Sequence, residues 1–344
     1  MRISWLSKIL ILVFSVLLCF VAYFVYNFQS INNRPFSSDV KINVKEGDTL
    51  NNVIDELANQ GKLRNHLFVK ISLKVFNYDT NIKPGEYSFG NDVSLGTFMA
   101  FLNKGVLNEF VKVTVPEGYS IEAMGELFEK SGLNFTKQDF LNEVRYYPLP
   151  KYVKNIEERR YLLEGFLFPD TYHFDKDSTP NVVIKTMIDR FEQVLKEIET
   201  ELKVSVPEDK IDDIVTMASI VEREIIHDEE RVKAASVFYN RLRVGMPLQS
   251  CATVIYALGK HKEVLYNSDL EVDSKYNTYK YSSLPIGPIA SPGRESIKAA
   301  ISPSDTNYLY FILNDETNYH YFFENYSDFL KQKAIRDTTL AVKK

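Results

Sequence analysis

The sequence predicts an α+β protein with a single N-terminal transmembrane helix, a small α+β domain and a larger mixed α/β domain. The prediction rests on an uninterrupted apolar run near the N-terminus, on short strand patterns each followed by an amphipathic helix, and on long helical patterns separated by turn-rich loops. The chain has 344 residues and is 45% hydrophobic. That content is enough to fill two or three cores by burial alone.

The apolar run covers residues 9–26 and contains no charged side chain. As a helix that rises about 1.5 Å per residue it would span about 27 Å, close to the hydrocarbon thickness of a bilayer. Arg2 and Lys8 precede the run, and the first acidic residue is Asp39. The positive-inside rule therefore places residues 1–8 in the cytoplasm and the body of the protein outside it.

A cleaved signal peptide is the main alternative to this membrane anchor. The segment that follows the apolar run, YNFQSINN, lacks a small-x-small cleavage pattern. Leu18, which precedes Cys19, is too bulky for the usual lipobox. We therefore expect an uncleaved single-pass anchor, followed by a polar linker over residues 27–39.

The charge balance and the missing motifs exclude several classes of function. Beyond residue 34 the chain has 38 lysine and arginine residues against 46 acidic ones, a net charge of −8. Nucleic acid is therefore excluded as a partner, because duplex binding needs a basic face. Cys251 is the one cysteine outside the apolar run, so an intramolecular disulfide is excluded there. The five histidines are scattered, and HExxH, CxxC, GxSxG, P-loop and GxGxxG patterns are absent, so we expect no metal and no cofactor.

The small domain is predicted over residues 40–106. An alternating strand begins at Val40, turns at Glu46-Gly47 and leads into a helix capped by Asp48 or Thr49. A second helix, a returning strand with the sequence KPGEYSF and a third helix that ends at Gly105 follow. The strand–turn–helix–helix order resembles a LysM module, a small unit that binds glycans containing N-acetylglucosamine. A plain α+β spacer domain fits the same pattern.

The larger domain is predicted over residues 107–344. Its first strand and helix repeat the opening unit, with Glu117-Gly118 in the place of the earlier Glu-Gly turn. Long helices follow, and Pro207 is placed to begin one of them. The proline- and glycine-rich segment after Gly259 predicts a long ordered loop, and such loops usually serve function. The sequences NYLYFIL and YHYFFEN then predict a hairpin before a C-terminal helix.

Two glutamates, Glu222 and Glu224, interrupt an otherwise apolar helical pattern. Burial disfavours the charged form of a carboxyl group, so such a glutamate can stay protonated near neutral pH and act as a general acid. The two residues are two positions apart and point about 200° from each other on a helix. They cannot face one cleft together, which argues against a paired-carboxylate glycosidase built from these two alone. Periodicity does not choose between them.

Two further groups of polar residues are candidates for the site. Asn240 and Arg241 lie on the next predicted helix, where they serve either a helix end and a salt bridge or the positioning of a ligand. The segment 276–279, YNTY, offers hydroxyls, an amide and the aromatic faces that suit sugar rings.

Several motifs together resemble the endolytic murein transglycosylases, the MltG/YceG-like family. The resemblance runs from the membrane anchor to the C-terminus. The motifs are EGFLFPDTY at 164–172, MASIVEREI at 217–225, RVKAASVFYNRLRVGMPLQS at 231–250, TVIYALG at 253–259, YNTY at 276–279 and LPIGPIASPG at 284–293.

The resemblance implies a bacterial lytic transglycosylase of the cytoplasmic membrane. Such an enzyme cleaves the bond between N-acetylmuramic acid and N-acetylglucosamine in nascent peptidoglycan, leaves a 1,6-anhydro end and so terminates strand elongation. It implies Glu224, the second glutamate of the E-x-E pair, as the catalytic acid, and penicillin-binding proteins or other wall synthases as partners. The implied substrate contacts are Glu164, Asn240, Arg241, Gln249, Thr253, Tyr276, Asn277 and Tyr279.

The chain departs from the family pattern at one position of this site. After the LQ dipeptide the family often has Thr/Ser-Asp-Pro-Thr, whereas this chain has Ser250-Cys251-Ala252-Thr253. A mechanism that needs a carboxylate at position 251 is therefore excluded here. Two other functions stay open: a lysozyme-type muramidase that pairs Glu224 with Glu164 or Asp170, and a non-enzymatic glycan-binding scaffold.

Overall fold

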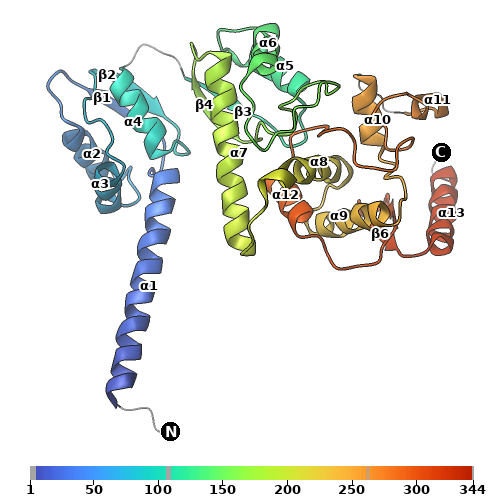
Figure 1. Cartoon of the computed structure of the whole chain (residues 1–344). Helices are drawn as coiled ribbons and strands as arrows, with labels where there is room; N and C mark the ends of the chain where they lie inside the picture. The colour runs from blue at the N-terminus through green and yellow to red at the C-terminus, as the bar shows by residue number, and fades with distance from the viewer. Residues whose placement is uncertain (1–4, 106–109, 261, 263, 343–344) are drawn as a thin grey trace. The chain divides into compact units, whose positions relative to one another are not determined.

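A computed structural model describes residues 5–105, 110–260, 262 and 264–342 (Figure 1). The chain divides into two compact units, one that ends at residue 109 and one that begins at Phe110. Among the described residues, the first unit combines helices with one two-stranded antiparallel sheet and the second unit combines helices with two such sheets. The predicted α+β class is thus confirmed.

The first unit begins with the long helix α1 (Trp5–Asn33). The part of α1 from Phe14 onward is long and apolar enough to cross a membrane. The helix continues past residue 26, where the sequence predicted a polar linker. The reason is tertiary packing against α3 (His66–Val75): the Phe24 ring lies 5.1 Å from the Phe68 ring, centroid to centroid.

The rest of the first unit follows the predicted order of elements. Strand β1 (Val40–Val44) pairs antiparallel with β2 (Gly85–Phe89), and α2 (Leu50–Asn59) and α3 lie between them in the chain. Helix α4 (Leu95–Lys104) completes the unit. Thr49 is the cap of α2, because its side-chain oxygen accepts a hydrogen bond from the Asn52 backbone at 3.3 Å.

The second unit opens with a strand pair and two helices. Strand β3 (Phe110–Thr114) pairs antiparallel with β4 (Thr171–Asp175). Helices α5 (Ile121–Ser131) and α6 (Lys137–Tyr146) pack on each other through Phe128 and Phe140, whose ring centroids are 5.0 Å apart. This cluster is a separate core that also takes side chains from the start of the next long helix.

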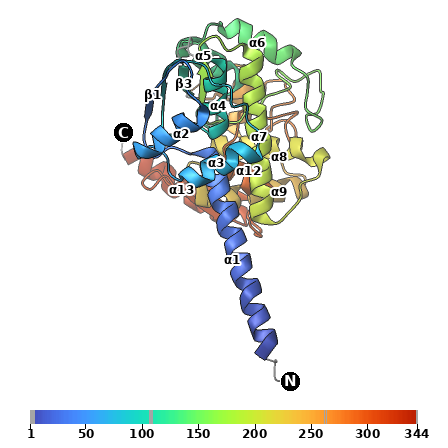
Figure 2. The same ribbon diagram turned by 90° about the vertical axis from the view of Figure 1, so that its left-hand side faces the viewer.

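The centre of the second unit is helical. The long helix α7 (Pro180–Leu202) is followed by α8 (Glu208–Glu224), α9 (Asp228–Arg243), α10 (Cys251–Leu258), α11 (Asn267–Leu270) and α12 (Arg294–Ile301). Helices α8, α9 and α12 pack side by side in both ribbon views (Figures 1 and 2). Pro207 directly precedes α8, as predicted.

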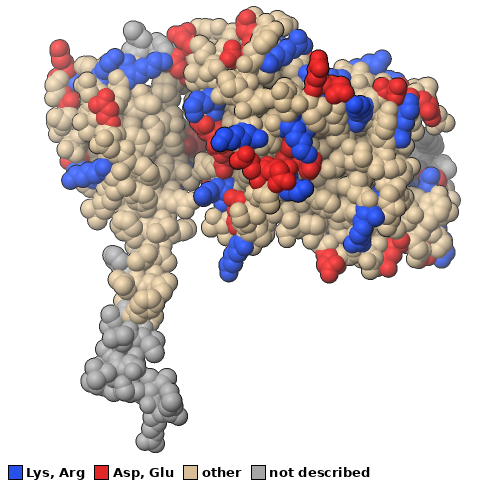
Figure 3. Space-filling model, in the orientation of Figure 1, with Lys and Arg blue, Asp and Glu red and all other residues tan. Residues whose placement is uncertain are grey.

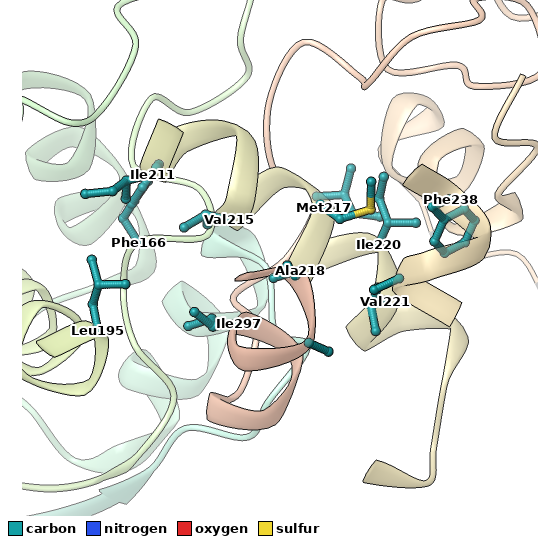
Figure 4. Close-up of a cluster of buried hydrophobic side chains, with 14 of the residues drawn as sticks. Phe166, Leu195, Ile211, Val215, Met217, Ala218, Ile220, Val221, Phe238 and Ile297 are labelled. Atoms are coloured by element: carbon teal, nitrogen blue, oxygen red, sulfur yellow. The ribbon is translucent and has the colours of Figure 1, made fainter. Parts of the chain in front are cut away.

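Helix α8 runs through the core of the second unit and carries Glu224 at its last position. Met217, Ala218, Ile220 and Val221 are fully enclosed by neighbouring elements (Figure 4). Burying each large apolar side chain contributes about 1.5–3 kcal/mol. The C-terminal end of α8 is therefore a rigid platform for the side chain of Glu224.

The predicted hairpin is present after α12. Strand β5 (Tyr310–Leu313) pairs antiparallel with β6 (His320–Phe323), and α13 (Tyr326–Val342) follows. Acidic and basic side chains interleave over the face of the molecule in Figure 3, and the described residues form no continuous basic surface there. This agrees with the net negative charge beyond the apolar run.

Candidate active site

Glu224 lies where the end of α8 meets the start of α10. The Ser250 hydroxyl donates a hydrogen bond to the Glu224 Oε1 at 2.5 Å, and the backbone N–H of Ala252 also interacts with this carboxyl. Ser250 occupies the N-cap position of α10, yet its side chain makes no capping bond to that helix. The N-terminus of a helix carries partial positive charge, so it favours the carboxylate form.

Opposing influences act on the protonation of Glu224. Burial raises the pKa of Glu224 above its ordinary value, while Ser250, Ala252 and the positive charges of His320 and Arg223 act in the opposite direction. The net effect is a raised pKa, so the protonated form persists toward neutral pH. The carboxylate form nevertheless finds hydrogen-bond donors already in place. The residue remains partly exposed, so a ligand can reach it.

Glu222 belongs to a different environment. Its Oε2 accepts hydrogen bonds from the Arg231 Nη1 and from the backbone N–H of Gly293, both at 3.0 Å. The side chain is 7% exposed, and Arg231 also binds Asp228. The two glutamates thus face different partners, as their spacing predicted.

A short hydrogen-bonded network fixes the loop that carries Ser250. Gln249 has a left-handed backbone with φ 54°, an arrangement that costs a non-glycine residue about 1 kcal/mol or more. Its N–H donates to the Thr278 carbonyl at 3.0 Å, and the Ser250 N–H donates to the Thr278 hydroxyl at 3.0 Å. The hydroxyls of Thr253 and Thr278 lie 2.9 Å apart. This network holds Ser250 against Glu224 and leaves the Gln249 side chain exposed.

The YNTY segment contributes one side chain that faces the Glu224 site. The Tyr279 hydroxyl lies 3.1 Å from the Cys251 Sγ, and burial with the thiol and the charge of Glu224 raises the pKa of Tyr279. Asn277 is buried, and its amide donates to the carbonyls of two residues upstream in the chain at 2.8 and 2.9 Å. Tyr276 packs edge-on against Tyr256 of α10.

Asn240 and Arg241 are buried on α9 and bind backbone carbonyls. The Asn240 amide donates to the carbonyls of Thr306 and Tyr308 at 2.8 and 3.0 Å. The Arg241 guanidinium donates to the carbonyls of Leu309 and Leu248, both at 2.7 Å. These contacts tie the segment before β5 to the loop that carries Ser250.

Glu164 lies in a closed part of the interior. It is 1% exposed; its Oε1 accepts from the Ile121 backbone and its Oε2 accepts from the Tyr256 hydroxyl, both at 2.9 Å. Burial raises the pKa of Glu164 to about 7. Asp170, the other predicted partner carboxylate, accepts from the Arg190 guanidinium at 2.7 Å. This geometry argues against the direct substrate contact that the sequence suggested for Glu164, because both of its oxygens are engaged and enclosed.

Gln249, Thr253 and Tyr279 thus lie on the two segments that hold Ser250 and Cys251 beside Glu224. The other predicted contacts, Asn240, Arg241, Tyr276 and Asn277, are buried. Ser250 and Thr278 were missed as site residues by the sequence reasoning. Helix α10 was not among the predicted elements, and a serine at its start would in any case have suggested a helix cap.

A partly exposed carboxyl group with a raised pKa, beside a hydroxyl donor and a helix N-terminus, is suited to general acid–base chemistry. The chain belongs to the YceG-like family, whose model matches residues 42–335.

Relatives with known names cover most of the chain. It is 32% identical over 290 residues to an endolytic murein transglycosylase of Bacillus subtilis (strain 168), a match that covers 79% of this chain and 78% of the relative. It is 29% identical over 347 residues to an endolytic murein transglycosylase of Streptococcus pneumoniae serotype 2 (strain D39). That match covers 92% of this chain but 62% of the longer relative. A crystal structure of a yceG-like protein from Listeria monocytogenes is similar in fold, with a TM-score of 0.58 and 31% identity over 86% of this chain and 100% of that chain.

Proposed function

We propose that this protein is a lytic transglycosylase that cleaves the bond between N-acetylmuramic acid and N-acetylglucosamine in nascent peptidoglycan. The observation that carries the proposal is Glu224, a single accessible carboxyl group whose surroundings suit both its protonated and its charged form. The names of the relatives support the substrate and the reaction class.

In the proposed mechanism Glu224 acts first as an acid and then as a base. The protonated carboxyl donates its proton to the glycosidic oxygen as the bond from the muramyl C1 to that oxygen breaks. The resulting carboxylate receives the hydrogen bonds of Ser250 and Ala252. It then removes the proton of the muramyl C6 hydroxyl while the C6 oxygen bonds to C1. A 1,6-anhydro ring is formed, and Glu224 has its proton back.

The muramidase alternative requires a second carboxylate that activates water or forms a covalent intermediate. Glu222, Glu164 and Asp170 are each bound to other groups of the protein. Position 251 is a cysteine. These observations favour a reaction that needs one carboxyl group.

The remaining predicted site residues take two roles in this proposal. Gln249 and Tyr279 contact the glycan, with Tyr279 nearest to the reacting bond, whereas the buried Tyr276 packs behind them against Tyr256. Asn240, Arg241, Thr253 and Asn277 shape the loops that carry these contacts, and Glu164 supports them from the interior.

The proposal includes anchoring by α1 in the bacterial cytoplasmic membrane, with the N-terminus in the cytoplasm. A catalytic unit tethered there would cut strands as they leave a synthase and so terminate their elongation. Penicillin-binding proteins are the proposed neighbours in this process. The strand–helix–helix–strand part of the first unit would bind or orient the glycan as a LysM-like module.

Digestion of peptidoglycan by the full-length protein in detergent tests the proposal. Mass spectrometry should detect 1,6-anhydromuramyl ends for the unaltered protein and for Glu208→Gln, a matched change at the exposed opposite end of α8, and almost none for Glu224→Gln. Reducing ends would favour a muramidase. Equal product from the unaltered protein and Glu224→Gln would favour a glycan-binding scaffold.

A further inference from the structure

A pocket of about 580 Å³ lies where the end of α6 meets the loop of residues 155–162. Charged and aromatic side chains from both elements line it, among them Arg145, Glu157, Arg159, Arg160 and Tyr161. Its volume is within the range of about 300–1,000 Å³ that is typical of ligand pockets. None of these residues takes part in the proposed reaction, so the reaction itself gives this arginine pocket no role.

Two of the guanidinium groups in the arginine pocket lack a carboxylate partner. The third, that of Arg159, is neutralised because it binds both oxygens of Asp212, at 2.5 and 2.9 Å, and its side chain is 1% exposed. Within the part of the chain that the structure describes, Arg145 and Arg160 form no ion pair, and Glu157 forms none either. The pocket thus offers two positive charges and one negative charge to a ligand.

Arg160 is held in place by α10 and the YNTY segment. Its guanidinium carbon lies 4.7 Å from the centroid of the Tyr256 ring, and its Nη2 donates to the Ala257 carbonyl at 3.3 Å. Its backbone N–H donates to the Tyr276 hydroxyl at 3.4 Å. A guanidinium carries five N–H donors in a planar fork, so donors remain for both oxygens of a carboxylate. Because these donors are positioned in advance, less conformational entropy is lost when a ligand binds.

Arg145 is supported by an aromatic ring. Its guanidinium carbon lies 5.9 Å from the centroid of the Tyr161 ring, and the Tyr161 hydroxyl donates to the Glu122 Oε1 at 2.5 Å. Glu122 also binds Lys137 at 2.9 Å, so its charge is already compensated. Arg145 is exposed, and a ligand can therefore reach it. Two arginines from different elements thus line one space, an arrangement that suits carboxylate groups.

Helix α10 connects the arginine pocket with Glu224. Ser250, which donates to Glu224, is the N-cap of this helix, and Ala257, which accepts from Arg160, lies one residue before its end. The helix rises about 10 Å between these two positions. An extended peptide spans about 3.3 Å per residue, so a branch of three or more residues on a sugar at Glu224 would cover this distance.

The substrate of the proposed reaction carries such a branch. The muramic acid of nascent peptidoglycan bears a short peptide on its lactyl group. This peptide has free carboxylates and, until the strand is cross-linked, the free amino group of a diamino acid. Its charges complement those of the pocket, with carboxylates for the two arginines and an ammonium group for Glu157.

We propose that the arginine pocket binds the peptide of the muramic acid whose glycosidic bond is cleaved. Arg145 and Arg160 bind its carboxylates, and Glu157 binds the ammonium group of the diamino acid. The inference rests on the proposed function and adds a binding site for a part of the substrate that does not react. Binding at this site orients the strand over Glu224 and favours strands that are not yet cross-linked.

The first test compares two substrates of the full-length protein in detergent. One is uncross-linked glycan strands with intact peptides, and the other is the same strands after an amidase has removed the peptides. Two hydrogen-bonded charge contacts, each worth about a factor of ten, should make kcat/KM for anhydromuramyl release about a hundredfold higher on the peptide-bearing strands. Equal kcat/KM values on the two substrates would overturn the inference, and this comparison needs no variant that has to fold.

The second test locates this preference in the arginine pocket. Arg145→Gln should reduce the ratio of kcat/KM between peptide-bearing and peptide-free strands about tenfold, mainly through KM, and Arg145→Lys should reduce it less because the charge remains. Lys151→Gln is the matched control, since Lys151 is exposed and precedes the loop without lining the pocket. Its ratio should equal that of the unaltered protein. An unchanged ratio in Arg145→Gln, or an equal fall in Lys151→Gln, would contradict the inference.

The third test concerns Glu157 and the amino group. Acetylation of the diamino acid should lower kcat/KM about threefold for the unaltered protein, since an exposed ion pair contributes little, and should have no such effect on Glu157→Gln. Equal sensitivity of both proteins would overturn the assignment of Glu157. Failure of the proposed function is a separate result, because the unaltered protein would then release no anhydromuramyl product from either kind of strand.

Discussion

Two carboxyl groups that contact α10 or its N-cap have similar surroundings and different access to solvent. Glu224 meets the first turn of this helix and Glu164 meets Tyr256 farther along it. Burial raises the pKa of both, a hydroxyl donates to both, and a backbone N–H at a helix start contacts both. Glu224 is partly open to solvent, however, and Glu164 is sealed. A raised pKa therefore identifies a carboxyl group that can act as an acid, and access decides whether it meets a substrate.

The strongest test of this comparison replaces each glutamate with glutamine and compares the activities of the two variants. Glu224→Gln should lower the rate about a thousandfold, because the amide cannot supply the proton. Glu164→Gln should stay within about threefold of the unaltered protein. The rates of anhydromuramyl release from the same peptidoglycan preparation give the comparison. A loss of similar size in Glu164→Gln would mean that the enclosed carboxyl group takes part in the chemistry.

The second test is the pH dependence of stability that Glu164 should impose. Its pKa in the folded protein is about 7, against an ordinary 4.5, so the folded state binds more protons between these values. The free energy of unfolding should therefore decrease by about 3 kcal/mol as the pH rises from 4.5 to 7 and change no further above that. Glutamine imitates the protonated carboxyl, so Glu164→Gln should lack this decrease. Urea unfolding at pH 5 and pH 8 measures the free energy of unfolding of each protein. An equal change between these pH values in the unaltered protein and in Glu164→Gln would contradict the prediction.

The third test weakens the surroundings of Glu224 and leaves its carboxyl group intact. Ser250→Ala removes the hydroxyl that stabilises the carboxylate, a contribution of about 1.5 kcal/mol for a hydrogen bond to a charged group. The rate should fall about tenfold, and the alkaline limb of kcat/KM should move to higher pH. Thr278→Ser, which keeps the hydroxyl that holds the same loop, serves as the control. An unmoved limb would show that Ser250 does not set the proton affinity of Glu224.

The smallest expected effect concerns Cys251, where the chain departs from the family pattern. Its thiol contacts the Tyr279 hydroxyl and, within the part of the chain that the structure describes, makes no hydrogen bond to Glu224. Cys251→Ser should change the rate of product release by no more than about threefold, since a hydroxyl can replace that contact. A loss above tenfold would place the thiol in the reaction.

Sequence patterns predicted most of the strands and long helices, because periodicity, caps and turns are local. The prediction of a long loop after Gly259 was wrong over α12, since the prolines and glycines that precede this short helix hid its pattern. The choice between Glu222 and Glu224 needed the family resemblance. Helix geometry shows that the two side chains point in different directions, but it does not show which residues each of them contacts. Their partners, Gly293 for one and Ser250 for the other, come from distant segments. The enclosure of Glu164 was missed for the same reason, because its partners lie 43 and 92 positions away in the chain.

Helix α1 does not end before the first domain; it ends inside it. Phe28 stacks on Phe76 just beyond α3, and Ile31 is buried. With α1 in a bilayer, as proposed, this unit would keep a constant distance from the lipid surface and would turn the same face toward it. Lateral diffusion in the membrane would then be its main freedom. Newly made strands near that surface would be within its reach, and older wall layers would lie beyond it.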